Sequence, residues 1–91
     1  MPEKNWFVYM LRCADNSLYT GITTDITRRL EEHNAKKSIS RYTRARQPVE
    51  LVYHETVESR SEAGKREVQL KKLKKADKEL LIESSEQYRY D

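Results

Sequence analysis

Two short apolar runs on either side of a polar turn constrain the fold of this chain more than any other feature of its sequence. They read WFVYMLR (Trp6 to Arg12) and LYTGIT (Leu18 to Thr23), and both are rich in the aromatic and β-branched residues that favour strands. The ADNS between them is typical of a turn. We therefore predict an antiparallel hairpin in which Tyr9 and Tyr19 face the same side of the sheet, while Thr20 faces the other side.

The hairpin is followed by a predicted helix over residues 25–34, which Thr24 can cap. The next segment, residues 35–47, is polar and basic, and we expect it to form a loop or a short irregular helix. Residues 49–56 alternate well enough between apolar and polar side chains to predict a third strand.

Two further helices complete the pattern. Ser59, followed three residues later by Glu62, is typical of a capping box and predicts a helix that ends near Leu73. The periodicity breaks near residue 75, before a last amphipathic helix. We expect an α+β fold of the order ββαβαα, with a three-stranded antiparallel sheet flanked by helices. This domain would occupy residues 1–83, with residues 84–91 as a frayed tail.

The composition limits the classes of protein to which the chain can belong. Its 91 residues suit one small domain. Lys and Arg outnumber Asp and Glu by 18 to 15, and the formal net charge of +3 suits a polyanionic partner. The single cysteine excludes an internal disulfide framework and a multi-cysteine zinc site. No apolar run is long enough for a signal peptide or a membrane span, so we expect a cytoplasmic protein without a membrane partner.

Three charged or titratable residues fall where helical periodicity predicts a buried face. Relative to Ile26, His33 lies within the apolar stripe of the first helix at about −20°, and Arg29 lies on its edge at about −60°. On the second helix Glu67 lies about 40° from Ala63, again among core-facing positions. Because burying an unpaired charge is costly, Glu67 should face a cation, a metal ion or a strong hydrogen-bond donor.

Each of these residues also has a purely structural interpretation. Glu67 can form an ion pair with Arg29, and His33 can cap or pack the end of its helix. Tyr9 and Tyr19 can be cross-strand packing partners. No single residue therefore decides between a structural and a functional role, and the case depends on their combination.

Four segments carry a family resemblance: FVY (residues 7–9), YTG (19–21), RRLEEHN (28–34) and SEAGKREVQLK (61–71). Together they resemble the GIY-YIG endonuclease superfamily, whose two strand motifs are represented here with the first glycine and both isoleucines substituted. The third segment resembles the family's helix with the catalytic arginine, and the fourth resembles the helix with the metal-binding glutamate. YTR before a proline and the strand LVYHE are typical of the small stand-alone bacterial subgroup, YhbQ-like or YazA-like.

The resemblance implies a role for each of five residues. Glu67 would anchor one Mg²⁺ or Mn²⁺ ion, and Arg29 would bind the scissile phosphate. Tyr9 would accept the proton of the attacking water, which requires nearby cations, here Arg29 and the metal ion, to lower the pKa of its phenol from the normal value of about 10. Tyr19 would position water or phosphate, and His33 would orient Tyr9 or assist proton transfer. Which of the two tyrosines and the histidine is the general base stays open.

Substrate binding is expected of small and basic residues near these groups. Gly21 would leave room for backbone or phosphate. Phosphate contacts and a stacking surface are expected from Arg41, Tyr42, Arg44 and Arg46 in the basic segment, and from Lys71 in a second basic run. Both basic runs can instead be ordinary solvated surface. We expect a nucleic acid as the partner, DNA more than RNA, recognised by backbone or shape rather than by sequence.

Two functions stay open at this point. The first is a metal-dependent endonuclease that hydrolyses DNA phosphodiester bonds, with branched or damaged DNA as candidate substrates. The second is a catalytically weak or inactive nucleic-acid-binding module on the same scaffold, because several family nucleases carry a late asparagine and the last asparagine here is Asn34. Glu67 favours the enzyme, since a carboxylate that faces a phosphate site would repel the ligand of a simple binding module.

Overall fold

The computed structural model of the protein describes residues 5–88. The elements in chain order are β1 (Trp6–Arg12), β2 (Leu18–Thr23), α1 (Ile26–Asn34), α2 (Arg41–Arg44), β3 (Glu50–Val57), α3 (Arg60–Lys72) and α4 (Lys75–Tyr88). The strands form one antiparallel three-stranded sheet in the order β2-β1-β3. The predicted α+β fold is thus confirmed, and the basic segment contains the short helix α2. None of the helices in the described range is long and apolar enough to cross a membrane.

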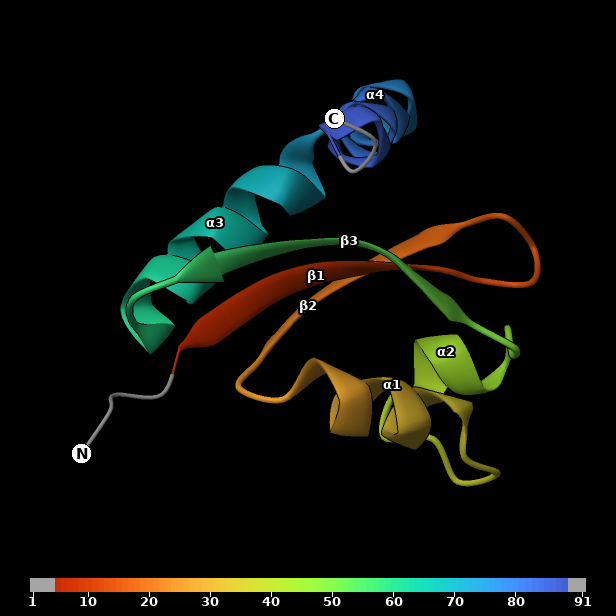
Figure 1. The fold of residues 1–91 in the computed structure, drawn as a ribbon. Coiled ribbons are helices and arrows are strands. Elements are labelled where there is room, and N and C mark those ends of the chain that lie inside the picture. Colours follow the sequence, from red (N-terminus) through yellow and green to blue (C-terminus); the bar gives the residue numbers. More distant parts are fainter. Residues whose placement is uncertain (1–4, 89–91) are drawn as a thin grey trace.

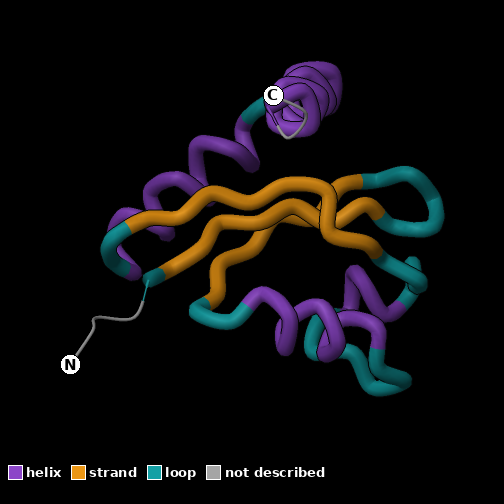
Figure 2. Tube along the Cα trace, viewed as in Figure 1, coloured by secondary structure: helices purple, strands orange, loops and turns teal. Residues whose placement is uncertain are grey.

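The sheet lies between two layers of helices. Helices α3 and α4 lie on one face of the sheet, and α1 and α2 lie on the other (Figures 1 and 2). Successive residues of β1 alternate between these layers, as the strand period requires. Val8 and Met10 pack in the cluster that includes residues of α3 and α4, whereas Tyr9 and Leu11 pack in a second cluster on the side of α1.

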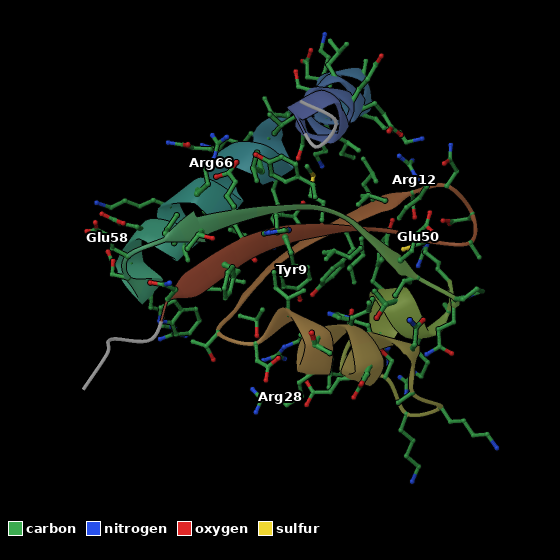
Figure 3. The ribbon with its side chains drawn as sticks, in the orientation of Figure 1. Tyr9, Arg12, Arg28, Glu50, Glu58 and Arg66 are labelled. Carbon is green, nitrogen blue, oxygen red and sulfur yellow. The ribbon has the colours of Figure 1, made fainter. Side chains whose placement is uncertain are left out.

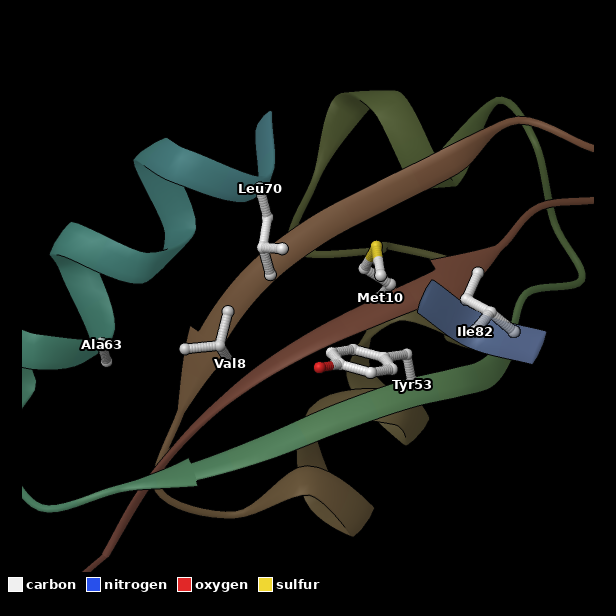
Figure 4. Close-up of a cluster of buried hydrophobic side chains, with 6 residues drawn as sticks. All are labelled: Val8, Met10, Tyr53, Ala63, Leu70 and Ile82. Atoms are coloured by element: carbon white, nitrogen blue, oxygen red, sulfur yellow. The ribbon is translucent and has the colours of Figure 1, made fainter. Parts of the chain in front are cut away.

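The main apolar core lies between the sheet and the layer of α3 and α4. Its buried side chains are Val8, Met10, Tyr53, Ala63, Leu70 and Ile82 (Figure 4). Ala63 and Leu70 are two helical turns apart, so they lie on the same face of α3. Because burial of a side chain such as Leu70 contributes about 1.5–3 kcal/mol, this core fixes the position of the helix that carries Glu67.

Helix α1 is joined at its C-terminal end, by hydrogen bonds, to the segment that directly precedes β3. The Asn34 side chain donates to the Val49 carbonyl at 2.9 Å and accepts the Val49 N–H at 2.8 Å. Nε2 of Gln47 donates to the carbonyls of His33 and Ala35, at 2.8 Å and 2.6 Å. These bonds satisfy carbonyls that the helix leaves unpaired and fix the last turn of α1, where His33 lies.

The cap of α1 differs from the prediction. Asp25, rather than Thr24, is the capping residue, and its carboxylate accepts the backbone N–H of Arg28 at 3.0 Å. A carboxylate interacts favourably with the positive end of the helix dipole as well as with the free N–H groups, which explains why it takes the capping position.

The last two helices follow the prediction at their start and differ at their end. Ser59 caps α3 as predicted, and α3 ends at Lys72. Helix α4 continues through Tyr88, so residues 84–88, which were expected in a frayed tail, are helical. The remainder of that expected tail, residues 89–91, lies outside the described residues.

We expect Asn34→Ala to lower the free energy of unfolding by about 1–2 kcal/mol, because it removes both hydrogen bonds to the Val49 backbone. Urea denaturation of the purified protein measures this change. Thr27→Ala, at an exposed position of the same helix, is the control and should change stability by less than about 0.5 kcal/mol. Equal urea midpoints for the two variants would show that the two hydrogen bonds between Asn34 and Val49 contribute nothing to stability.

Candidate active site

Tyr9 on β1 lies directly opposite Gly21 on β2. A Cβ atom at Gly21 would lie 2.5 Å from Oη of Tyr9 and 2.6 Å from its Cζ, so the phenol lies across the glycine backbone. Only a residue without a side chain permits so close an approach. The space at Gly21, which was expected to serve backbone or phosphate, is therefore filled by Tyr9, whose side chain lies between β1 and α1 (Figure 3).

Tyr9 is the first member of a buried hydrogen-bonded chain. Its hydroxyl lies 3.0 Å from Nε2 of His33, and Nδ1 of His33 lies 2.8 Å from Oγ1 of Thr43. Tyr9 is 3% exposed, and His33 and Thr43 are 0% exposed. Helical periodicity predicted the inward orientation of His33. It gave no signal for Thr43, because α2 has only four residues and is too short for a periodic pattern.

His33 lies against both tyrosines of the hairpin. Its ring centroid is 5.0 Å from that of Tyr19 and 6.0 Å from that of Tyr9. The two tyrosines therefore face the same side of the sheet, as predicted. Thr20 pairs with Met10, which belongs to the core on the opposite face, so its predicted orientation is also confirmed.

Arg29 lies on α1 one turn before His33, and its side chain is 31% exposed. Its Nε is 3.5 Å from the Glu32 carboxylate, yet this atom is buried and makes no hydrogen bond within the described part of the chain. The charge of Arg29 acts to lower the pKa values of both Tyr9 and His33. A buried N–H without an acceptor is available to an anionic group that enters the site.

Glu67 lies on α3, in the opposite layer. It borders a groove of about 500 Å³ between α3 and β2. Its ion partner is Lys71, at 3.4 Å, and the alternative pair with Arg29 is not among the ion pairs of the described residues. The negative charge of Glu67 contributes to raising the pKa of Tyr9, so the two groups are linked electrostatically rather than by a hydrogen bond.

The protein environment favours the neutral forms of Tyr9 and His33. Burial raises the pKa of Tyr9 above its usual value, the nearby Tyr19 and Glu67 add to this, and together they outweigh Arg29. Arg29 acts in the expected direction, but its charge alone does not offset the effect of burial on this pKa. Burial, with the charge of Arg29, lowers the pKa of His33. A neutral imidazole has one ring nitrogen free to accept a proton.

The basic segment divides into exposed and tethered residues. Arg41 and Arg44 are exposed on α2. Arg46 instead donates to Asp15 at 3.0 Å, and its guanidinium carbon lies 3.9 Å from the ring centroid of Tyr42. Its contacts are those of a structural residue, and Tyr42 is already covered on one side by a cation. The expectation that both serve the substrate directly is not supported by these contacts.

The oxygen donors present suit a hard divalent ion held mainly by the substrate. Within residues 5–88 no group of three or more His, Cys, Asp or Glu side chains could enclose a metal ion. Glu67 supplies a single carboxylate that is 24% exposed. One carboxylate completed by water and phosphate oxygens fits the usual coordination of Mg²⁺, so the donor set is compatible with the predicted ion.

A family model described as the GIY-YIG catalytic domain matches residues 5–80. A UPF0213 protein of Desulfotalea psychrophila is 56% identical over 81 residues, which are 89% of this chain and 74% of that protein. The solution NMR structure of a UPF0213 protein from Bacillus halodurans is 42% identical with a TM-score of 0.55, over 87% of this chain and 83% of the other. A second NMR structure, of a protein from E. faecalis, is 39% identical with a TM-score of 0.61, over 94% and 92% of the two chains.

The two glycines of the chain give a matched pair of substitutions. Gly21→Ala should displace the Tyr9 phenol and lower the free energy of unfolding by about 1–3 kcal/mol. Gly64→Ala adds a methyl group with no described atom within 4 Å and should stabilise α3 by about 0.5–1 kcal/mol. Urea denaturation compares the two. An unchanged midpoint for Gly21→Ala would contradict the close packing of Tyr9 on the glycine.

The lowered pKa of His33 predicts a pH dependence of stability. Below about pH 6.5 the unfolded chain binds a proton at His33 that the folded chain resists, so acidification favours unfolding. Between about pH 7.5 and 5.5 the free energy of unfolding should fall more steeply for the wild type than for His33→Gln, by at most about 1.4 kcal/mol per pH unit. Equal slopes in urea denaturation would contradict a buried neutral imidazole.

Proposed function

The chain belongs to the GIY-YIG catalytic domain family, and from this premise we propose that it is a nuclease that hydrolyses DNA phosphodiester bonds with one divalent metal ion. The observation that carries this proposal is the buried hydrogen bond between Tyr9 and His33 beside the unsatisfied Nε of Arg29. Attack of water on a phosphate group requires a proton acceptor for the water and a hydrogen-bond donor for the negatively charged phosphate. The relatives described above are similar in sequence, and their names state no activity.

Arg29 and Glu67 are the groups proposed to meet the phosphate. Arg29 would donate hydrogen bonds to the scissile phosphate and stabilise its growing negative charge. Glu67 would hold one Mg²⁺ or Mn²⁺ ion, which when bound supplies a positive charge at the leaving oxygen. Lys71 is tied to the Glu67 carboxylate and adds a second cation at the same place.

Tyr9 and His33 are proposed to take the proton of the attacking water together. The raised pKa of Tyr9 disfavours a free tyrosinate as the base. Tyr9 can instead accept the water proton as it passes its own proton to Nε2 of His33, 3.0 Å away. No ionised phenol then has to form in a buried site. Tyr19, in contact with the same imidazole, would position the water or the phosphate.

Substrate contacts are proposed for the exposed side of α2. Arg41 and Arg44 are free of the ion pairs seen within the described residues and can reach phosphates on either side of the scissile bond. The contacts available are basic and non-directional, which suits recognition of backbone or shape. DNA is proposed as the substrate because the resemblance to the GIY-YIG endonucleases implies it.

One observation favours a second candidate function, a DNA-binding module with little or no catalysis. Glu67 is paired with Lys71, and no further carboxylate, histidine or cysteine in the described part of the chain completes a metal cluster. Such a module would use the same arginines and leave phosphodiester bonds intact. The two functions differ in whether cleavage depends on a metal ion.

Purified protein incubated with plasmid and with branched DNA should cleave in Mg²⁺ or Mn²⁺ and not in EDTA. We expect Glu67→Gln and Arg29→Ala each to lower the rate by about 100-fold or more, because each removes charge stabilisation from the transition state. Glu62→Gln and Arg28→Ala change the same charges at exposed positions of the same helices and should retain activity. Gel electrophoresis measures cleavage, and fluorescence anisotropy measures DNA binding in parallel.

Two results would count against the enzyme. Binding of DNA without cleavage in either metal supports the binding module. Cleavage that persists in EDTA or in Glu67→Gln would contradict the assigned role of the carboxylate.

A further inference from the structure

We propose that Thr43 is a positioning residue of this site: its hydroxyl accepts the Nδ1 proton of His33 and so leaves Nε2 unprotonated to receive a proton from Tyr9. The inference deepens the proposed nuclease function and rests on it for its catalytic consequence. The tautomer assignment itself stands on the geometry of the buried side chains.

Thr43 is fully buried and its hydroxyl has three polar neighbours. Oγ1 lies 2.8 Å from Nδ1 of His33, 2.8 Å from Oγ of Ser38 and 3.3 Å from the carbonyl oxygen of Ser40. The chain thus places a hydroxyl group, with one proton to give and two lone pairs to accept, among three candidate partners. Their proton requirements decide which way each hydrogen bond runs.

A count of protons gives one arrangement that uses every contact. The Ser40 carbonyl accepts the Arg44 N–H at 2.9 Å and has a second lone pair, so its contact with Oγ1 uses the single hydroxyl proton of Thr43. Ser38 accepts the Ser40 N–H at 3.3 Å and is free to donate its own proton to Thr43. Thr43 then has one lone pair left for His33, so Nδ1 must carry the proton and donate it.

The opposite arrangement is less well satisfied. If Thr43 donated to Nδ1, its contact with the Ser40 carbonyl would contain no proton, and that carbonyl would keep only the Arg44 N–H at 2.9 Å. Nε2 would then carry the ring proton and point it at the Tyr9 hydroxyl, 3.0 Å away. His33 could accept nothing from Tyr9 in that state.

The tautomer decides whether the proposed proton transfer can proceed. With Nε2 unprotonated, the water O–H bond breaks as a new O–H bond forms at Tyr9. At the same time the Tyr9 O–H bond breaks and an N–H bond forms at Nε2 of His33. The resulting imidazolium keeps its Nδ1–H bond to Thr43, which stabilises the added charge. The hydroxide released from water is free to attack phosphorus.

The same residue connects the substrate contacts to the proton acceptor. Helix α2 presents Arg41 and Arg44 to solvent and Thr43 to the interior. A phosphate bound by these arginines therefore acts on the one turn of helix that orients His33. Docking of the substrate and alignment of the proton acceptor depend on a single short element.

Nitrogen NMR of the His33 side chain tests the assignment directly. In the wild type at neutral pH we expect Nδ1 protonated and Nε2 unprotonated. Thr43→Val keeps the shape without the hydroxyl and should move His33 toward the other tautomer or a mixture, while Thr43→Ser keeps the hydroxyl and the wild-type tautomer. Thr56→Val, at an exposed position of β3, is the matched control. A wild-type imidazole protonated at Nε2, or a Thr43→Val spectrum equal to the wild type, would overturn the proposal.

Cleavage kinetics test the consequence. Thr43→Val should lower kcat by about 10- to 100-fold with KM for DNA unchanged, and Thr43→Ser should recover most of the rate. If Thr43→Val changes the tautomer and leaves kcat intact, the positioning role is wrong. If the wild type cleaves no DNA in any metal, the proposed function fails, whereas the NMR spectra still decide the hydrogen bond between Thr43 and His33.

Discussion

The close approach of the Tyr9 phenol to the backbone at Gly21 is the constraint on which the rest of the site depends. Because the glycine has no side chain, the ring lies across the neighbouring strand and its hydroxyl reaches His33 at 3.0 Å. The histidine can then be buried on α1 with both ring nitrogens satisfied, since Thr43 meets the second one. One small residue in β2 thus decides where the layer of α1 and α2 can lie.

The orientation of most site residues could be predicted from the sequence, because strand alternation and helical periodicity depend on local geometry alone. They gave the common side of Tyr9 and Tyr19 and the inward orientation of His33. Partners across the fold could not be predicted in this way. Thr43 lies on the short helix α2, which follows an irregular loop, and it contacts His33. Arg46 contacts Asp15 on the hairpin turn. Neither contact follows a helical or strand period, so neither could be predicted from the pattern.

The charge state of Tyr9 shows why electrostatics needs the three-dimensional structure. The sequence suggests a lowered pKa for the Tyr9 phenol, because Arg29 is a cation expected near it. Desolvation acts in the opposite direction and depends on how much protein surrounds the phenol, which no local pattern contains. Glu67 differs in this respect: its pair with Lys71 follows the local i,i+4 spacing of a helix, whereas its distance from Arg29 depends on how the two helical layers pack.

The two helical layers are attached to the sheet by different forces. The larger apolar core holds α3 and α4. Helix α1 combines a smaller apolar cluster, which includes its Leu30, with hydrogen bonds from Asn34 and Gln47 that need correct angles as well as distances. The layer with His33 therefore has the smaller apolar contact with the sheet, and local opening of this layer should need less free energy than opening of the main core on the other face. An imidazole that is 0% exposed would become accessible to solvent only through such local opening.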